Sequence, residues 1–181
     1  MTLMGRSPHP DRLAPRFWPV WSGQTCSAIG SEISGMGTAV YVFVTTGSSI
    51  WLGVLTALAT LPRVLTVPFM TWVDRWPRKA TMMGADALAA LGPVTLLAAV
   101  AVEDVAVWHL AVAAVLSGTG SAFQAPAAQA AVPLLAGPGA LARANGLMQL
   151  GPAIGIVVGP AVAAPLVARW GLAPVIAIDL I

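Results

Sequence analysis

Residues 146–165 read GLMQLGPAIGIVVGPAVAAP, a glycine-rich apolar stretch that contains no charged residue. The uncharged run around it extends from Ala144 to Ala168. A helix rises about 1.5 Å per residue, so this run exceeds the roughly 20 residues that cross the hydrocarbon core of a bilayer. Glycine recurs every fourth residue near its centre, a spacing that lets a second helix approach closely. The stretch therefore predicts a tightly packed transmembrane helix.

The composition extends this prediction to the whole chain. Of its 181 residues, 57% are hydrophobic and 9% are charged, with a mean hydropathy of +0.83. A soluble domain carries roughly 25% charged residues, and a disordered chain combines high charge with low hydrophobicity. A disulfide scaffold is excluded because Cys26 is the only cysteine. The chain is therefore predicted to be an all-α membrane protein.

Hydropathy divides the chain into a polar leader and a transmembrane domain. Residues 1–16 are predicted to be an unstructured cytoplasmic leader, and residues 17–181 a helical membrane domain. Five complete spans are expected near residues 18–45, 50–73, 80–101, 106–131 and 142–168, and a sixth begins near residue 172. The ten residues from there to Ile181 cover only about 15 Å as a helix, half of the hydrocarbon thickness. We expect five full helices and a truncated sixth.

Basic residues predict the orientation of these spans. A cytoplasmic amino terminus places seven basic residues inside and only Arg169 outside, in agreement with the positive-inside rule. The seven are Arg6, Arg12, Arg16, Arg75, Arg78, Lys79 and Arg143. The loop with Glu103 and Asp104 then lies outside. All seven tryptophans fall near predicted span ends, as an interfacial aromatic belt requires. The sequence pI of about 9.3 is therefore attributed to membrane topology, not to nucleic-acid binding.

Two ionisable residues are predicted to lie near the middle of the membrane. Glu32 flanks a polar stripe on the first span, and Arg63 shares a helical face with Thr56 and Thr60 on the second. An arginine at a helix centre costs roughly 2.5–3.5 kcal/mol on insertion, so that face should point at helices or a wet cavity. The stripe consists of Gln24, Ser27, Ser31, Ser34 and Thr38.

We expect Glu32 and Arg63 to face each other or to share a central cavity. Ionisable residues inside a membrane are candidates for a substrate or proton pathway. The alternative is a structural ion pair, or two side chains that snorkel toward a water defect. Asp86 lies nearer the predicted inner surface, where it is expected to reach Arg78 or Lys79 in a structural contact.

Residues for enzymatic chemistry are lacking. His9 and His109 are far apart in the chain and only one cysteine is present, so neither a metal-binding motif nor a cofactor is predicted. A nucleophile motif such as GxSxG is also absent. The sequence therefore predicts no enzyme.

The loop between the second and third spans reads VDRWPRKA at residues 73–80. It resembles the loop of the major facilitator superfamily that carries G-x3-D-[RK]-x-G-[RK]-[RK], although Met70 and Pro77 replace the two glycines. The resemblance implies a gating loop that latches the two halves of the transporter. A plain topogenic loop is the alternative. The matching residues are Asp74, Arg75, Arg78 and Lys79.

The fifth span resembles the antiporter motif of the same superfamily, G-x8-G-x3-G-P-x2-G-G. Gly146, Gly155, Gly159 and Pro160 match that pattern, and alanines replace its last two glycines. A glycine-rich packing helix without an antiporter role is the alternative.

Residues 17–181 are similar to the macrolide-efflux and enterobactin-exporter-like branch of the superfamily. The resemblance implies the amino-terminal six-helix half of a major facilitator fold, in a multi-pass transporter of the bacterial inner membrane. It further implies efflux of drugs or small metabolites by proton antiport, together with a carboxyl-terminal half. An arginine common in the fourth helix of proton-driven relatives is Val115 here, so Glu32 and Arg63 are the proposed substitute. The alternatives are a non-transporting truncated remnant and a half-transporter that pairs with another subunit.

Overall fold

The computed structural model describes residues 13–69, 77–137 and 139–180, and every regular element among them is a helix. The prediction of an all-α protein with short links is confirmed. The helices are α1 (Phe17–Thr46), α2 (Ser49–Thr66), the 3-10 turn η1 (Val67–Phe69), α4 (Arg78–Ala101), α5 (Val107–Ala136), α6 (Leu141–Trp170) and α7 (Ala173–Asp179).

Within the described ranges, three helices are long and apolar enough to cross a membrane. They are Ser49–Thr66, Ala80–Ala101 and Leu141–Trp170. Both α1 and α5 have 30 residues, which is ample length for a crossing. Neither of them contains a stretch as apolar as those in the other three, so their crossings stay predictions from length.

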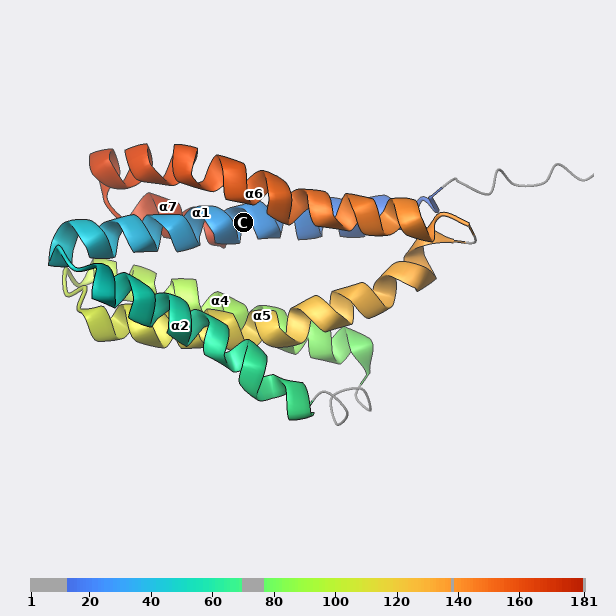
Figure 1. Ribbon diagram of the computed structural model, residues 1–181, viewed down its shortest axis with the longest axis horizontal. Helices are drawn as coiled ribbons and strands as arrows, with labels where there is room; N and C mark the ends of the chain where they lie inside the picture. Colours follow the sequence, from blue (N-terminus) through green and yellow to red (C-terminus); the bar gives the residue numbers. More distant parts are fainter. Residues whose placement is uncertain (1–12, 70–76, 138, 181) are drawn as a thin grey trace, which may run out of the picture.

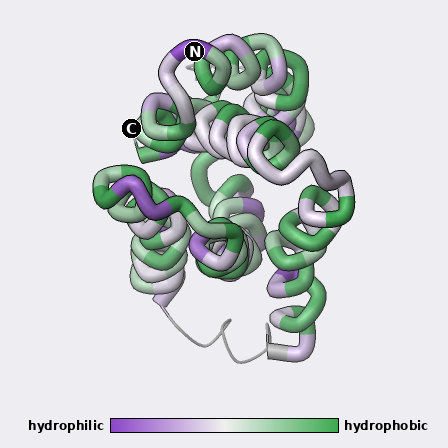
Figure 2. The backbone as a smooth tube through the Cα atoms, turned by 90° about the vertical axis from the view of Figure 1, so that its left-hand side faces the viewer, coloured by the Kyte–Doolittle hydropathy of each residue, from purple (hydrophilic) through white to green (hydrophobic). Residues whose placement is uncertain are grey.

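The helices form two groups, which Figure 1 shows from the side and Figure 2 shows end-on. In the first group, α1 packs along α6, and α7 lies against α1. In the second group, α5 lies between α2 and α4 and contacts both extensively. Contacts between α1 and α2 or α5 are much smaller, so the two groups are largely separate.

Glycine allows the close contact between α2 and α5. A Cβ atom at Gly118 would lie 2.2 Å from the carbonyl oxygen of Ala59, far inside van der Waals contact. Only a residue without a side chain fits there, and the two backbones touch as a result. This contact fixes which face of α2 points toward α5.

Apolar clusters join the two groups at both ends. One cluster lies near the α1–α2 link and contains Val42, Leu55, Leu96, Leu110, Ala113, Leu172 and Ile176. The other lies where α1 begins and contains Phe17, Val132, Ala136 and Ala144. Each cluster includes residues from both groups, so the groups meet at their ends and leave space between them along the middle.

The residues just before α1 differ from the unstructured segment that was expected. The backbone N–H of Ala14 donates to the Ala136 carbonyl over 3.4 Å, and the Arg16 guanidinium donates to the Leu134 carbonyl over 2.6 Å. These bonds form because the last carbonyls of α5 lack partners within their own helix. Residues 13–16 therefore dock on the end of α5, while residues 1–12 lie outside the described residues.

Candidate functional site

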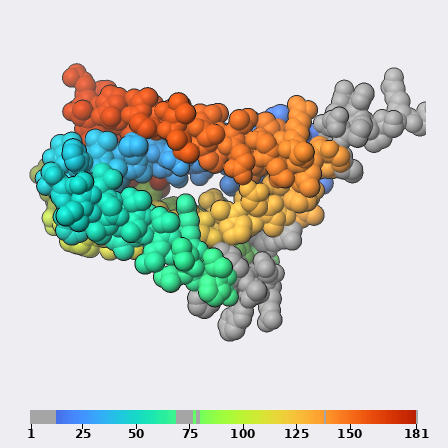
Figure 3. Space-filling model, viewed as in Figure 1, coloured from blue at the N-terminus to red at the C-terminus, as the bar shows by residue number. Residues whose placement is uncertain are grey.

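The polar stripe of α1 faces the second group of helices. Gln24, Ser31 and Thr38 follow Phe17 at steps of seven residues, which is about two helical turns. They consequently point in the direction of Phe17, whose ring packs against Val132 of α5. Figure 3 shows the molecule hollowed between α1 and α6 on one side and α2 and α5 on the other. Ser31 is exposed midway along α1 and lines this hollow, whereas Ser34 of the same stripe is buried.

Glu32 lies beside the stripe, with the stem of its side chain against α6. A Cβ atom built at Gly155 would be only 2.7 Å from Glu32 Cγ, and one at Gly159 would be 3.2 Å from the Glu32 carbonyl oxygen. The side chain of Glu32 is nevertheless exposed. The structure thus brings together Glu32 and two antiporter-motif glycines, which the sequence patterns identified separately.

The remaining motif residues of α6 lie in two environments. Gly151 continues the contact face, with a position for Cβ that is 2.9 Å from Thr25 Cα. Gly146, in contrast, would place a Cβ atom in open space, and Pro160 is exposed. The small-residue seam against α1 therefore consists of Gly151, Gly155, Gly159 and the buried Ala163.

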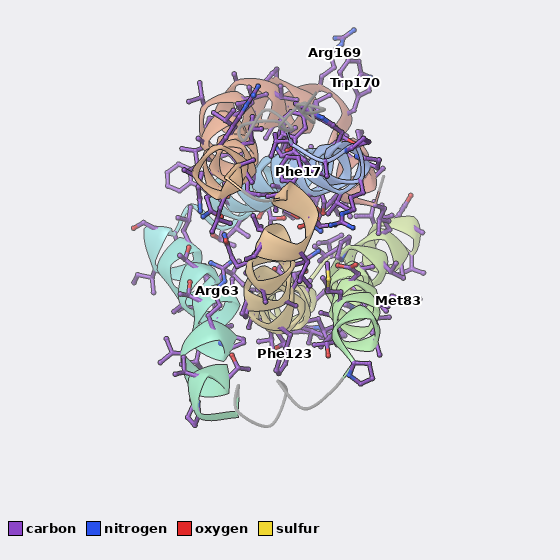
Figure 4. The ribbon with its side chains drawn as sticks, turned by 90° about the vertical axis from the view of Figure 1, so that its right-hand side faces the viewer. Phe17, Arg63, Met83, Phe123, Arg169 and Trp170 are labelled. Carbon is purple, nitrogen blue, oxygen red and sulfur yellow. The ribbon has the colours of Figure 1, made fainter. Side chains whose placement is uncertain are left out.

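Arg63 lies on α2, where Figure 4 labels it. Its helix turns Leu55, Pro62 and Thr66 inward, and Arg63 adjoins that buried face on the flank shared with Thr56. Exposed apolar side chains occupy the opposite flank of α2; they are Val54, Leu61 and Leu65. Arg63 therefore lies on the more polar side of its helix, as the sequence pattern predicted.

Glu32 and Arg63 are not in direct contact. Glu32 packs on α6, and the contact between α1 and α2 is small. Within the described ranges, neither a hydrogen bond nor an ion pair links the two side chains. Of the two arrangements that were expected, direct pairing is not seen and a shared cavity remains. The roles of both residues stay predictions.

The gating-loop residues can be placed only in part. Asp74 and Arg75 lie outside the described residues, and Arg78 and Lys79 are described only as the first two residues of α4. Asp86 has a partner other than the cations that were expected. The Gln124 side-chain amide of α5 donates to the Asp86 carboxylate, because the packing of α4 on α5 brings the two side chains together.

A second carboxylate in the first group was not identified from the sequence. The Ser31 hydroxyl donates a hydrogen bond of 2.7 Å to Oδ1 of Asp179, at the end of α7. The available signal was a single carboxylate within the apolar run LAPVIAIDLI at residues 172–181. Ionisable residues in such runs are candidates for function. Among the described residues, no group of three or more histidine, cysteine or acidic side chains could hold a metal ion.

Comparison with known proteins identifies the family. The Major Facilitator Superfamily profile matches residues 20–181. Macrolide efflux protein A from Streptococcus pyogenes is 36% identical over 168 residues, which cover 92% of this chain and 41% of that protein. Macrolide efflux protein A from Enterococcus faecalis is 39% identical over 110 residues, which cover 60% of this chain and 34% of that protein. The chain therefore spans about two fifths of the length of the first of these relatives.

No solved structure matches the chain. The family match agrees with the apolar helices and with the glycine seam between α1 and α6. The chain is a membrane protein and belongs to the Major Facilitator Superfamily.

Proposed function

We propose that this chain is the amino-terminal half of a secondary active transporter that exports drugs or small metabolites by proton antiport. The observation that carries the proposal is the placement of Glu32. It lies midway along α1, beside a polar stripe that lines a hollow, and its stem rests on the antiporter-motif glycines of α6. An exposed carboxylate at this depth of a membrane protein suits the binding of a cation or proton.

Arg63 is proposed to complete the pathway from the other side of the hollow. Its guanidinium is permanently charged, so it supplies a fixed positive charge. A fixed cation and a titratable carboxylate that share one water-filled space influence each other without touching, because charge interactions extend several ångströms. Glu32 and Arg63 would then hold the site near neutrality when the carboxylate is ionised.

The orientation and the gating loop belong to the same proposal. We place the amino terminus in the cytoplasm of a bacterial cell, with the chain in the inner membrane, because most basic residues then lie inside. Asp74, Arg75, Arg78 and Lys79 are proposed to form contacts with the other half that break and reform during transport.

A carboxyl-terminal half is the proposed partner. Transporters of this type place their substrate site between two repeats, and this chain holds the length of one. The match to the S. pyogenes relative covers 41% of that protein, which leaves room for a second repeat. By similarity to this relative, macrolides are the first substrates to test.

An efflux assay tests the proposal. Drug-sensitive bacteria would express this chain alone, or with a carboxyl-terminal half encoded directly downstream or taken from the S. pyogenes relative. We refer to the combination as the two-half transporter. Cells with the two-half transporter should accumulate less labelled macrolide, and collapse of the proton gradient should restore accumulation. Accumulation equal to that of empty cells, with both halves present in the membrane, would support a non-transporting remnant instead.

A further inference from the structure

The carboxylate of Asp179 is held on α1 by close backbone contact between α1 and α7. A Cβ atom at Gly30 would lie 3.1 Å from the carbonyl oxygen of Ile178, and one at Gly37 would lie 2.3 Å from a methyl carbon of Val175. Val175 is fully buried in this contact. The glycines of α1 therefore fix the position of α7, and with it the side chain of Asp179.

Two serine hydroxyls of α1 surround this carboxylate. Ser31 donates to Oδ1 over 2.7 Å, and the buried Ser34 lies near the carboxylate, less than one turn further along α1. Asp179 itself is half-buried. These partners provide hydrogen bonds but no positive charge.

The proposed topology, with Gly171 at the outer surface, places Asp179 deep in the membrane. Asp179 follows Gly171 by eight residues, which span about 12 Å as a helix, and half of the hydrocarbon core is about 15 Å. A carboxylate at that depth requires a proton or a cation to balance its charge.

The charged groups on the neighbouring helices do not supply that balance. On α1, Glu32 is itself acidic and rests on α6. On α4, Asp86 is bound by Gln124, and the cations are in the first turn of the helix. On α6, the cations are near the ends of the helix, at Arg143 and Arg169. Within the described residues, Asp179 therefore has hydroxyl partners and no ion pair.

A hydroxyl is suited to a carboxylate that changes its charge state. Serine can both donate and accept a hydrogen bond, whereas arginine and lysine only donate. When Asp179 is ionised, Ser31 donates to it, as the structure shows. When Asp179 is protonated, its own O–H can donate to Ser31, so the same pair remains bonded after one hydrogen bond reverses direction.

We propose that Asp179, Ser31 and Ser34 form a proton-binding site of the transporter. In this step an Asp179 oxygen takes a proton from water on one side of the membrane and becomes a neutral acid. It later returns the proton to water on the other side. The inference rests on the proposed antiport function, since it names a carboxylate that carries the coupling proton in addition to the Glu32 region.

The first test probes the site without transport. Membranes that contain this chain would be treated with dicyclohexylcarbodiimide, which attacks protonated carboxyl groups in apolar surroundings, over a series of pH values. Mass spectrometry should find Asp179 modified at low pH and protected as the pH rises. In Ser31→Ala the half-labelling pH should rise by about one unit, because the hydroxyl no longer stabilises the ionised form. Ser31→Thr, which keeps the hydroxyl, should restore the parent value.

Two results would overturn the site. One is labelling of Asp179 that does not change with pH, and the other is a half-labelling pH that is the same in Ser31→Ala and the parent chain. Both readouts use the native Asp179, so they do not depend on whether a variant at that position folds.

The second test separates proton coupling from structure. In the two-half transporter, Asp179→Asn should lose export driven by a pH gradient but keep the exchange of labelled for unlabelled substrate, which needs no net proton movement. Asp86→Asn is the matched control and should keep both activities. Gradient-driven export that persists in Asp179→Asn contradicts the proposal. If the parent pair shows no export while Asp179 labelling remains dependent on pH and on Ser31, the antiport function fails and the proton site stands.

Discussion

Gly155→Ala tests whether the seam between α1 and α6 positions Glu32. The added methyl group would lie 2.7 Å from Glu32 Cγ, 3.0 Å from Glu32 Cβ and 3.4 Å from Ile29 Cα. Carbon atoms in contact are about 3.5–4.0 Å apart, so about 1 Å of overlap must be removed. Rotation of the flexible Glu32 stem relieves the nearest overlap, and the Cβ overlap remains unless the helices separate slightly.

The expected cost follows from two opposing effects. Overpacking lowers the stability of the folded state by about 1–3 kcal/mol. Replacement of glycine by alanine within a helix raises it by up to about 1 kcal/mol. We therefore expect Gly155→Ala to lower the free energy of unfolding by about 1 kcal/mol, a moderate loss. Efflux per folded molecule should also fall in Gly155→Ala, because the Glu32 carboxylate is displaced.

Two glycines of the same chain provide matched controls. Gly146→Ala lies on the same helix, and its Cβ meets no atom within 4 Å, so stability and efflux should be unchanged or slightly improved. Gly118→Ala places its Cβ 2.2 Å from the Ala59 carbonyl oxygen, which cannot rotate away. Its folding loss should exceed that of Gly155→Ala.

Unfolding in a detergent titration, measured beside macrolide accumulation with the two-half transporter, separates these effects. The reasoning predicts that folding is reduced most in Gly118→Ala and that efflux per folded molecule is reduced most in Gly155→Ala. Equal behaviour of Gly155→Ala and Gly146→Ala in both assays would refute the contact between Glu32 and the seam.

Three further predictions concern topology, gating and substrate charge. Arg78→Cys, in a Cys26→Ser background, should react with a permeant thiol reagent but not with an impermeant reagent added to sealed cells; reaction with the latter would reverse the orientation. Asp74→Asn should impair efflux by the two-half transporter at normal membrane abundance, because interdomain contacts of the loop are lost; unchanged efflux would leave a topogenic loop. Glu32→Gln should abolish export of cationic compounds and spare neutral ones, while an equal loss for both would remove the proposed role in substrate binding.

Hydropathy and turn residues predicted the helices well, since these signals are local. The predicted third and fifth spans differ from α4 and α6 by two residues or fewer at each end. The fourth span was expected to end near residue 131, whereas α5 continues through Pro133 to Ala136. A proline removes one backbone donor, and a membrane helix tolerates it because neighbouring groups compensate.

The candidate site was less predictable, because a sequence shows which residues share a helical face but not which helix covers that face. The spacing of polar residues in the first span predicted that Glu32 lies beside a polar stripe. It did not predict that the helix packed against Glu32 is α6 and not α2. Ser31, which binds Asp179, was identified from the sequence as part of the stripe. Asp179 itself was not identified as a candidate site residue. Its helix α7 has only seven residues, too few to display a periodic pattern.

The contacts at the start of α1 have a consequence for how the protein is made. Arg16 bonds to a carbonyl 118 positions later in the chain, and the indole N–H of Trp21 donates over 2.8 Å to the Leu147 carbonyl, 126 positions later. At about 5–20 residues per second, the ribosome needs about 6 to 24 s to synthesise the Arg16 partner. During that interval the guanidinium and the indole have only water and lipid headgroups as partners. Insertion of the first helix therefore precedes its native anchorage, and the correct tilt of α1 is set only when α5 and α6 have been synthesised.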